Sequence, residues 1–392
     1  MSDPCAIIAG DVVCSLGGSV EEVWRRMLKN ECGLRPLRRL PRGRYLSDIA
    51  GEISQETESL IRSEVAASNQ EWAWPLSLYV ARRVLDRGGT ARQRAERTGL
   101  ILSTTKAEIG NIERMAARPD ETVGDHHNAY ALARDLAAAL GLRGPVFAVS
   151  NACASGLVAI VQAARLLRRD DADRMLVVGV DVLSDFLMAG FSSLNALSRD
   201  ACRPFDAKRT GLSLGEGAAA MLMARAGDST EPALGTLLGW GVSDDANHIT
   251  APSRTGDGLK RALVQALKMS ELAPSEIHYI NGHGTGTFYN DEMEAKAVRG
   301  VFGLPTPPVT SMKGYLGHTL GAAGVIETVL SLTAMRERLV PASMGLQEIG
   351  VSEPINIPTQ RLPLAKLDHV LTLKCGFGGM NAALVLGRGG AS

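Results

Sequence analysis

The chain has 392 residues, of which 45% are hydrophobic, so it is long enough and apolar enough to bury a sizeable core. Its 42 basic and 42 acidic side chains balance, which argues against a protein that binds nucleic acid. The six cysteines lack both the CxxC spacing of structural zinc sites and the compact framework of a disulfide scaffold. Because no apolar run approaches the roughly 18 residues of a membrane span and no leader pattern is recognisable, we expect a cytoplasmic protein without membrane segments.

Short apolar runs alternate with longer segments of helical periodicity, a pattern typical of α/β proteins. In the first half we expect a strand at 5–10, a helix at 20–30, a strand at 98–104, a helix at 127–141, a strand at 145–150, a helix at 153–169, and strands at 174–180 and 217–224. In the second half we expect a strand at 234–242, a helix at 258–269, a strand at 277–282, helices at 290–302 and 322–338, and strands at 369–375 and 381–387.

Each half contains a glycine-bearing turn that leads into a long apolar helix, and each half ends with a pair of strands. The sequence therefore predicts two similar α/β halves, residues 1–230 and 231–392, which are joined near residues 225–235.

Cys153 lies in the segment VSNACASGLVAIVQAARLL (149–167), where a strand ends and a long helix begins. The turn between them contains only small residues, which leaves room for a substrate carbonyl at the sulfur. The positive end of a helix favours a thiolate, and the N–H groups there can form an oxyanion hole. A buried structural cysteine is the other interpretation, and this turn alone leaves both open.

Two histidines lie in glycine-rich turns, His283 in NGHGTGT (281–287) and His318 in KGYLGHTLGAAG (313–324). Flanking glycines let a substrate or the backbone approach each imidazole closely. Ligands of α/β proteins tend to bind beyond strand ends, which is where His283 falls. Taken singly, His283 could be a turn histidine bonded to the backbone, and His318 could cap the following helix.

Taken together, these residues resemble the β-ketoacyl-acyl carrier protein synthases, in particular the elongating ketosynthases of bacterial fatty acid and polyketide synthesis. The segments that carry the resemblance, in chain order, are IIAGDVVCSLGGSVEEVWRRMLKNECGL, VSNACASG, CRPFDAKRTGLSLGEGAAAMLM, DDANHITAP, NGHGTGT, SMKGYLGHTLGAAGVIE and CGFGGMN. The resemblance implies an α/β thiolase-like fold, in which two similar halves form a five-layer α/β/α/β/α core, usually as a dimer.

The resemblance also implies a Cys-His-His site formed by Cys153, His283 and His318. It adds Lys313 and Glu327 to the catalytic set, and we interpret these two as a supporting buried ion pair rather than as groups with a chemical step of their own. The substrate-binding residues that it implies are Thr285, Thr287, Phe191, Phe377, Gly376 and Gly378. Among these, the two threonines match residues that hydrogen-bond a phosphopantetheine arm, and the phenylalanine of the GFGG turn matches a gating residue.

The implied reaction is a decarboxylating Claisen condensation, in fatty acid synthesis or in type II polyketide synthesis, polyenes included. Cys153 takes an acyl group from a carrier protein, and a malonyl thioester then loses CO₂ and attacks the acyl group. The N–H groups of Cys153 and Phe377 are expected to hold the oxyanion, while the two neutral histidines donate to the thioester oxygen. No metal or diffusible cofactor is implied. The expected partners are an acyl carrier protein and either a second copy of the chain or a related chain-length-factor subunit.

Several features depart from the elongating pattern. Cys375 stands where a phenylalanine is common, Met380 replaces the threonine of GFGGTN, and the segments 105–128 and 197–205 look short. Thiolases carry a second catalytic cysteine in a C-terminal glycine turn, so a non-decarboxylating thiolase is one alternative, although HGTGT is unlike the asparagine-containing thiolase motif. The active subunit of a ketosynthase/chain-length-factor heterodimer is another. A chain-length factor itself lacks the nucleophile. We interpret Cys375 as enlarging the space beside Cys153.

Overall fold

The computed structural model describes residues 4–65, 71–89, 92–120, 123–228 and 232–389. Within these ranges, ten strands form one sheet in the order β10-β9-β13-β14-β8-β1-β7-β6-β4-β5. The strands of this sheet are β1 (Cys5–Cys14), β4 (Thr98–Ser103), β5 (Val146–Val149), β6 (Arg174–Asp181), β7 (Gly217–Arg225), β8 (Gly235–Asp244), β9 (Tyr279–Asn281), β10 (Val309–Thr310), β13 (His369–Cys375) and β14 (Met380–Arg388).

The order of the strands repeats within this sheet. The five strands from the first part of the chain follow one another as β1-β7-β6-β4-β5, and the five from the second part follow as β8-β14-β13-β9-β10. When the five strands of each set are numbered in chain order, the first pairs with the fifth and the fifth with the fourth. The fourth then pairs with the second, and the second with the third. The sets meet where residues 5–7 of β1 pair antiparallel with residues 235–237 of β8. The predicted division at residue 230 falls in 229–231, outside the described residues, and stays a prediction.

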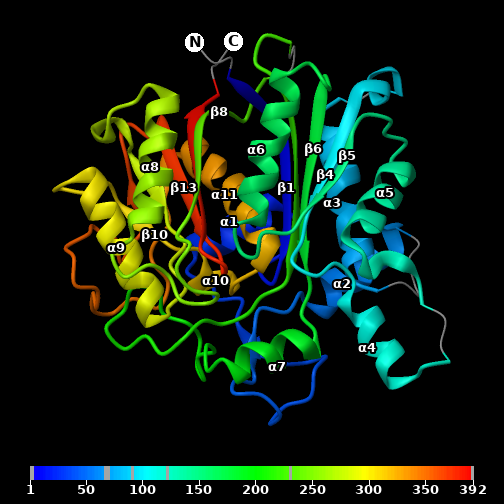
Figure 1. The fold of residues 1–392 in the computed structure, drawn as a ribbon, viewed down its shortest axis with the longest axis horizontal. Coiled ribbons are helices and arrows are strands. Elements are labelled where there is room, and N and C mark those ends of the chain that lie inside the picture. Colours follow the sequence, from blue (N-terminus) through cyan, green and yellow to red (C-terminus); the bar gives the residue numbers. More distant parts are fainter. Residues whose placement is uncertain (1–3, 66–70, 90–91, 121–122, 229–231, 390–392) are drawn as a thin grey trace.

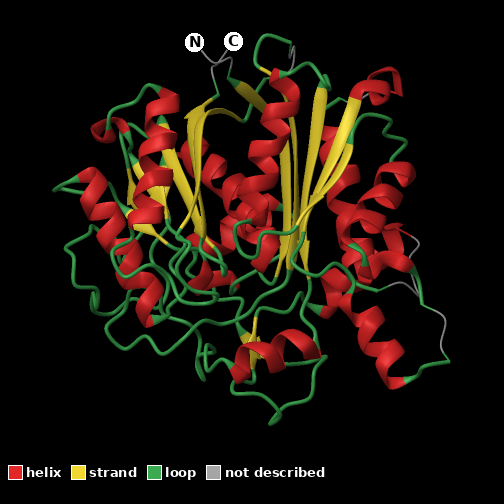
Figure 2. Ribbon diagram, viewed as in Figure 1, coloured by secondary structure: helices red, strands yellow, loops and turns green. Residues whose placement is uncertain are grey.

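The helices form layers on both sides of each set of strands (Figure 1, Figure 2). Helices α6 and α11 contact each other in the middle, and α11 contacts both β7 of the first set and β13 of the second. Helices α3 and α5 cover the outer side of the first set, and α8, with α9 against it, covers the outer side of the second. This is the five-layer α/β/α/β/α arrangement that the sequence predicts. The α-helices are α1 (Val20–Leu28), α2 (Gln55–Val65), α3 (Ala73–Arg87), α4 (Ile109–Ala117), α5 (Ala129–Ala139), α6 (Ser155–Arg168), α7 (Asp185–Ser193), α8 (Asp257–Ser270), α9 (Phe288–Phe302), α10 (Lys313–Leu316) and α11 (Ala323–Glu337).

The two central helices touch at their N-terminal ends through glycine. A Cβ atom on Gly156 of α6 would lie 2.7 Å from the Cα of Gly324 of α11, closer than real Cβ contacts allow. Only glycine at both positions permits this approach. As a result, the turn before α6 and the loop before α11, which carry Cys153 and His318, lie against each other.

Each strand and helix predicted from the sequence is present with similar bounds. The sequence pattern does not predict the helices α2, α3, α4, α7 and α10 or the two-residue strand β10. Helix α3 contains Pro75 in its first turn, where proline is tolerated although it reads as a helix breaker. The remaining short elements are β2 (Arg35–Pro36), β3 (Ile49–Ala50), β11 (Leu339–Val340), β12 (Leu362–Pro363) and the 3₁₀ turns η1 (Arg92–Arg97), η2 (Asp125–His127), η3 (Pro274–Glu276) and η4 (Leu320–Ala322). No helix in the described part of the chain is both long enough and apolar enough to cross a membrane.

Candidate active site

Cys153 lies in a tight turn between β5 and α6. Ala152 adopts a positive φ of 48°, a conformation that costs energy in any residue with a Cβ atom. The hydroxyl of Ser155 closes the turn, because it accepts a hydrogen bond from the Asn151 N–H at 2.7 Å and donates to the Ala152 carbonyl at 2.6 Å. The turn presents the sulfur of Cys153 to a cavity while only 7% of the residue is exposed.

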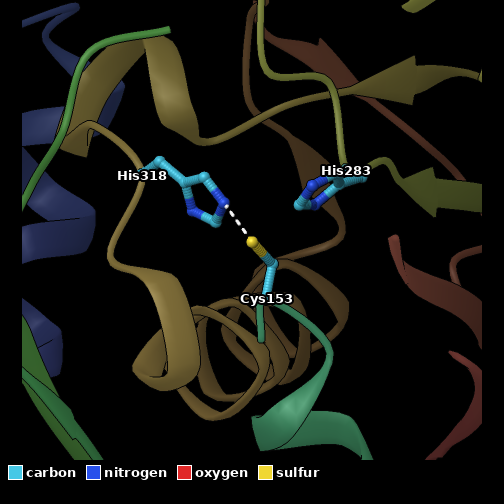
Figure 3. A group of neighbouring side chains, drawn as sticks. All are labelled: Cys153, His283 and His318. Atoms are coloured by element: carbon cyan, nitrogen blue, oxygen red, sulfur yellow. Dashed lines mark hydrogen bonds between the residues drawn. The ribbon is translucent and has the colours of Figure 1, made fainter. Parts of the chain in front are cut away.

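Three side chains from distant parts of the sequence converge at this sulfur (Figure 3). Cys153 comes from the start of α6, His283 from the turn after β9, and His318 from the loop before α11. One nitrogen or sulfur atom of each lies within 4.8 Å of the other two. The two imidazole rings meet edge to face with their centroids 5.2 Å apart. The three residues predicted from the sequence therefore form one site.

The hydrogen bonds of His318 fix which nitrogen carries its proton. Nδ1 accepts a hydrogen bond from the Leu320 N–H at 3.2 Å, so the proton of the neutral ring lies on Nε2. Nε2 is 3.0 Å from the sulfur of Cys153 and points at it. Burial, reinforced by the nearby charge of Lys313, holds the pKa of both His283 and His318 well below the ordinary value for histidine. Both rings are therefore neutral at pH 7 and can act as hydrogen-bond donors.

The thiol of Cys153 differs from the sequence-based expectation. Burial raises its pKa to about 11, although the charge of Lys313 and the backbone N–H of Phe377 oppose that rise. The helix end was expected to favour the thiolate, but the net shift of the pKa has the opposite direction, because the loss of hydration outweighs the nearby donors. The resting sulfur is a thiol, surrounded by donors that stabilise negative charge once it develops.

Two buried carboxylates of α9 shape the turn that carries His283. Glu294 accepts hydrogen bonds from the N–H groups of His283 at 2.8 Å and Gly284 at 2.7 Å. Asp291 accepts one from the N–H of Thr285 at 3.0 Å. These bonds satisfy N–H groups that the turn would otherwise leave unpaired in the interior, and they fix the orientation of the imidazole.

A buried ion cluster lies behind the two histidines. Glu327 of α11 binds the ammonium of Lys313 at 2.9 Å and that of Lys374, from β13, at 2.8 Å. Lys313 also donates to the carbonyl of His283 at 2.6 Å. The predicted pair of Lys313 and Glu327 is present, and neither residue lines the cavity, which agrees with a supporting role. Lys374 was missed, and its only signal in the sequence is a lysine within the apolar strand HVLTLKC.

The sulfur opens into a cavity of about 470 Å³. Of the substrate-binding residues that the sequence implies, those that line it are Thr285, Thr287, Phe191, Phe377 and Gly376. The two threonine hydroxyls lie 2.9 Å apart. The rings of Phe191 and Phe377 stack with centroids 5.8 Å apart, so one covers the other. Gly378 lies in the same turn as Phe377 but does not line the cavity; its positive φ of 86° gives the turn its shape.

Cys375 also lines the cavity, beside the turn that faces the nucleophile. Its thiol is not part of the group formed by Cys153, His283 and His318 among the described residues. Burial, together with the negative charge of Glu294, raises the pKa of this thiol well above its ordinary value. A thiol in this setting is poorly suited to give or take a proton near neutral pH.

The family model for the beta-ketoacyl synthase N-terminal domain matches residues 2–229, and the model for the C-terminal domain matches residues 234–347. The chain is 29% identical to 3-oxoacyl-[acyl-carrier-protein] synthase 2 of Coxiella burnetii, over 96% of each chain. It is 31% identical to the mitochondrial 3-oxoacyl-[acyl-carrier-protein] synthase of Arabidopsis thaliana, over 95% of this chain and 91% of that one.

Solved structures of ketosynthases also superimpose on this chain over nearly its whole length. The ishigamide ketosynthase/chain length factor superimposes with a TM-score of 0.90 at 26% identity, over the whole of both chains. A chain of the complex between the ketosynthase ApeO and its chain length factor ApeC, from Xenorhabdus doucetiae, gives a TM-score of 0.86 at 30% identity, over 98% of each chain. With family models that together span most of its length, the chain belongs to the beta-ketoacyl synthase family.

Proposed function

We propose that this chain is a 3-oxoacyl-[acyl-carrier-protein] synthase that extends an acyl group by decarboxylative condensation with a malonyl thioester. The observation that carries the proposal is the meeting of one thiol and two neutral imidazoles in the lining of one cavity. A thiol accounts for acyl transfer. The pair of imidazole donors is what the loss of CO₂ from a malonyl thioester needs in addition.

In the first half-reaction, the sulfur of Cys153 attacks the carbonyl of an acyl thioester on a carrier protein. A new C–S bond forms, the bond to the carrier thiol breaks, and the proton of Cys153 leaves with that thiol. The N–H groups of Cys153 and Phe377 both reach the sulfur, so they are placed to bind the oxyanion beside it. The acyl group then remains on Cys153.

In the second half-reaction, a malonyl thioester places its thioester oxygen between His283 and His318. As the bond to the carboxylate breaks, its electron pair moves onto the α-carbon and the charge spreads to this oxygen. Neutral imidazoles stabilise that charge by donating hydrogen bonds, and CO₂ leaves. The carbanion attacks the acyl carbon on Cys153, the C–S bond breaks, and the 3-oxoacyl product remains on the carrier. The sulfur leaves as a thiolate and takes up one proton from solvent, which restores the resting thiol.

The cavity fits the thioester arm of an acyl carrier protein. Its lining is mostly apolar and includes the paired hydroxyls of Thr285 and Thr287 together with Cys153. Hydroxyl pairs suit the amide groups of a phosphopantetheine arm, which needs donors and acceptors along its length. We therefore take an acyl carrier protein as the partner that delivers both substrates.

Intact-mass spectrometry tests the proposed function directly. The purified chain is incubated with a panel of acyl-carrier thioesters, and malonyl-carrier protein is then added. We expect the mass of one acyl group on the protein, followed by release of CO₂ and appearance of a 3-oxoacyl-carrier product. Formation of a 3-oxoacyl product from two non-malonyl thioesters, without CO₂, would show a thiolase instead.

A variant of Cys375 distinguishes decarboxylative condensation from thiolase chemistry. Replacing Cys375 with serine is expected to leave most of the condensation rate, within about threefold, because its buried thiol lines the cavity but does not belong to the group formed by Cys153, His283 and His318. Steady-state turnover of malonyl-carrier protein measures this. A thiolase that uses Cys375 to move the α-proton would lose nearly all of its activity in the same variant.

The exposed edge of the sheet at β5 supports the presence of a second subunit. In the described residues β5 pairs only with β4, and Phe147 on β5 is 40% exposed. Helices α4 and α7 contact each other and expose Ile112, Met115 and Phe186. Edge strands and apolar patches of this kind are normally covered by a partner. We propose that the active species pairs this chain with a second copy or with a chain-length-factor subunit, since ApeO has such a partner.

Light scattering of the purified chain distinguishes these assemblies. We expect either a dimer of twice the chain mass or a monomer that gains activity only with a related subunit that lacks the nucleophile. Phe147→Asp is expected to shift either pair towards separate chains, because it places a charge on the exposed edge strand. A monomer with full condensation activity would contradict the prediction.

A further inference from the structure

Lys374 is a fully buried lysine with a defined place in the site. It comes from the end of β13, three residues before Phe377, and none of its surface is exposed. Its ammonium lies 2.8 Å from Glu327 and donates to the carbonyl of Leu373 at 2.8 Å. Burying an ammonium is costly, so a lysine here needs a specific partner, and Glu327 is that partner.

Glu327 is shared by two lysines that approach from different elements. Lys313 reaches it from α10 and Lys374 from β13, while the amide of Asn281 donates to it from β9 at 3.0 Å. Burial lowers the pKa of Lys374 to about 8, although the charge of Glu327 opposes this shift. Below that pH, two ammonium groups and one carboxylate leave the cluster with a net charge of +1. Burial alone would raise the pKa of Glu327, but Lys313 and Lys374 together lower it to about 2, so this carboxylate stays ionised.

The positive charge of the Lys313, Lys374 and Glu327 cluster acts on the two imidazoles. After burial, the causes that hold down the pKa of His283 and His318 include the charges of both Lys313 and Lys374. Other ionisable groups of this region approach from several elements. They are Glu294 and Asp291 on α9, Asp181 on β6, Cys153 before α6, and Cys375, which follows Lys374 on β13. Burial raises the pKa of Glu294 to about 7, so this group offsets the lysines only in part.

We propose that Lys374 is a positioning residue for the condensation site, a second cation that holds Glu327 from the strand side and keeps His283 and His318 in their neutral, hydrogen-bond-donating form. The inference rests on the proposed function, because neutral imidazoles are what the decarboxylation step uses. Lys374 also ties Glu327 to the strand that leads into the Gly376 and Phe377 turn, so the same ion pair holds one oxyanion donor in register with the histidines.

The sign of the effect follows from the charge. Removing Lys374 lowers the cluster charge from +1 to 0, so an imidazolium beside it becomes less unfavourable and the pKa of each histidine rises. An imidazolium forms only as the pH falls through that pKa, so the variant loses its neutral histidines at a higher pH than the wild type. At pH 8, above the ordinary value for histidine, both proteins keep neutral rings.

The test is the pH profile of malonyl-carrier decarboxylation by the complete protein with its carrier protein. Lys374→Met roughly keeps the side-chain volume and removes the charge. We expect the midpoint of the acid limb of its profile to lie about one pH unit higher than in the wild type. At a pH below both midpoints, its rate should therefore be about tenfold lower than that of the wild type. Thr372→Val is the matched control. This buried neutral residue on the same strand accepts from Asn281 at 3.0 Å, and its loss is expected to leave the position of the limb unchanged whatever it does to the rate.

A second variant covers the case in which Lys374→Met does not fold. The double variant Lys374→Met/Glu327→Gln removes one cation and one anion, which restores the cluster charge to +1 and leaves no carboxylate short of a partner. We expect its acid limb to return towards that of the wild type. An acid limb at the wild-type position in Lys374→Met, or one that stays displaced in the double variant, overturns the inference.

A titration of the histidines separates this inference from the proposed function. Protein labelled with ¹⁵N-histidine, with signals assigned through His283→Asn and His318→Asn, reports the protonation of both rings without any turnover. Both rings should take up protons about one pH unit higher in Lys374→Met than in the wild type. If the wild type fails to decarboxylate malonyl thioesters, the proposed function fails while the titration still decides the role of Lys374. If the wild type is active but the titrations coincide, the inference alone fails.

Discussion

Cys153→Ala is expected to abolish the acyl-enzyme and to lower the condensation rate on the order of 10³-fold or more, because it removes the sulfur that forms the thioester with the acyl group. The other cysteine that lines the cavity, Cys375, has a thiol whose pKa is raised well above its ordinary value by burial. Intact-mass spectrometry after incubation with an acyl-carrier thioester measures the first effect, and formation of the 3-oxoacyl product measures the second.

The same variant should keep part of the chemistry. His283 and His318 remain in place in Cys153→Ala, so the protein is expected to continue to release CO₂ from a malonyl thioester although it cannot use the carbanion for chain extension. This uncoupling distinguishes the loss of the nucleophile from a general collapse of the site. Cys14→Ala is a matched control, since Cys14 is also buried but lies in β1 and does not line the cavity. Acylation of Cys153→Ala at the wild-type rate would refute the assignment of the nucleophile.

The sequence predicts the site well where local chemistry determines it. Cys153 with its small neighbours, and His283 and His318 with their glycines, each lie in the turn that the pattern indicates. The local turns depend on residues close together in the chain, and a single sequence displays them. The five-layer arrangement is instead what the family resemblance implies, and the alternation of strands and helices agrees with it.

Features that depend on the tertiary structure were missed or given the wrong sign. Lys374 could not be recognised as part of the site, because its partner Glu327 lies 47 positions away in the sequence and only the packing of α11 against β13 brings them together. The expected direction of the pKa shift at Cys153 was wrong for a similar reason. A helix end can be read from the sequence, but the degree to which the fold removes water from the sulfur cannot, and here that loss of water decides the direction of the pKa.

The two histidines are expected to have unequal roles, and their alanine variants should show it. His318 contacts the sulfur of Cys153 at 3.0 Å, whereas no hydrogen bond joins His283 to that sulfur among the described residues. His318→Ala should therefore slow both acylation and decarboxylation. His283→Ala should leave acylation within a few fold of the wild type and lower decarboxylation by about 10²- to 10³-fold, the usual cost of losing one donor to a developing oxyanion.

Separate measurement of the half-reactions decides this. The rate of acyl-enzyme formation is followed by mass, and the rate of CO₂ release from malonyl-carrier protein is followed in the absence of an acyl donor. His278→Ala serves as the control, because this half-buried histidine precedes the other end of β9 and stacks near His369, remote from the sulfur. Equal loss of acylation in His283→Ala and His318→Ala would contradict the division of roles. Decarboxylation that survives in both variants would remove the histidine pair from the mechanism, because the buried site would then stabilise the enolate through other donors.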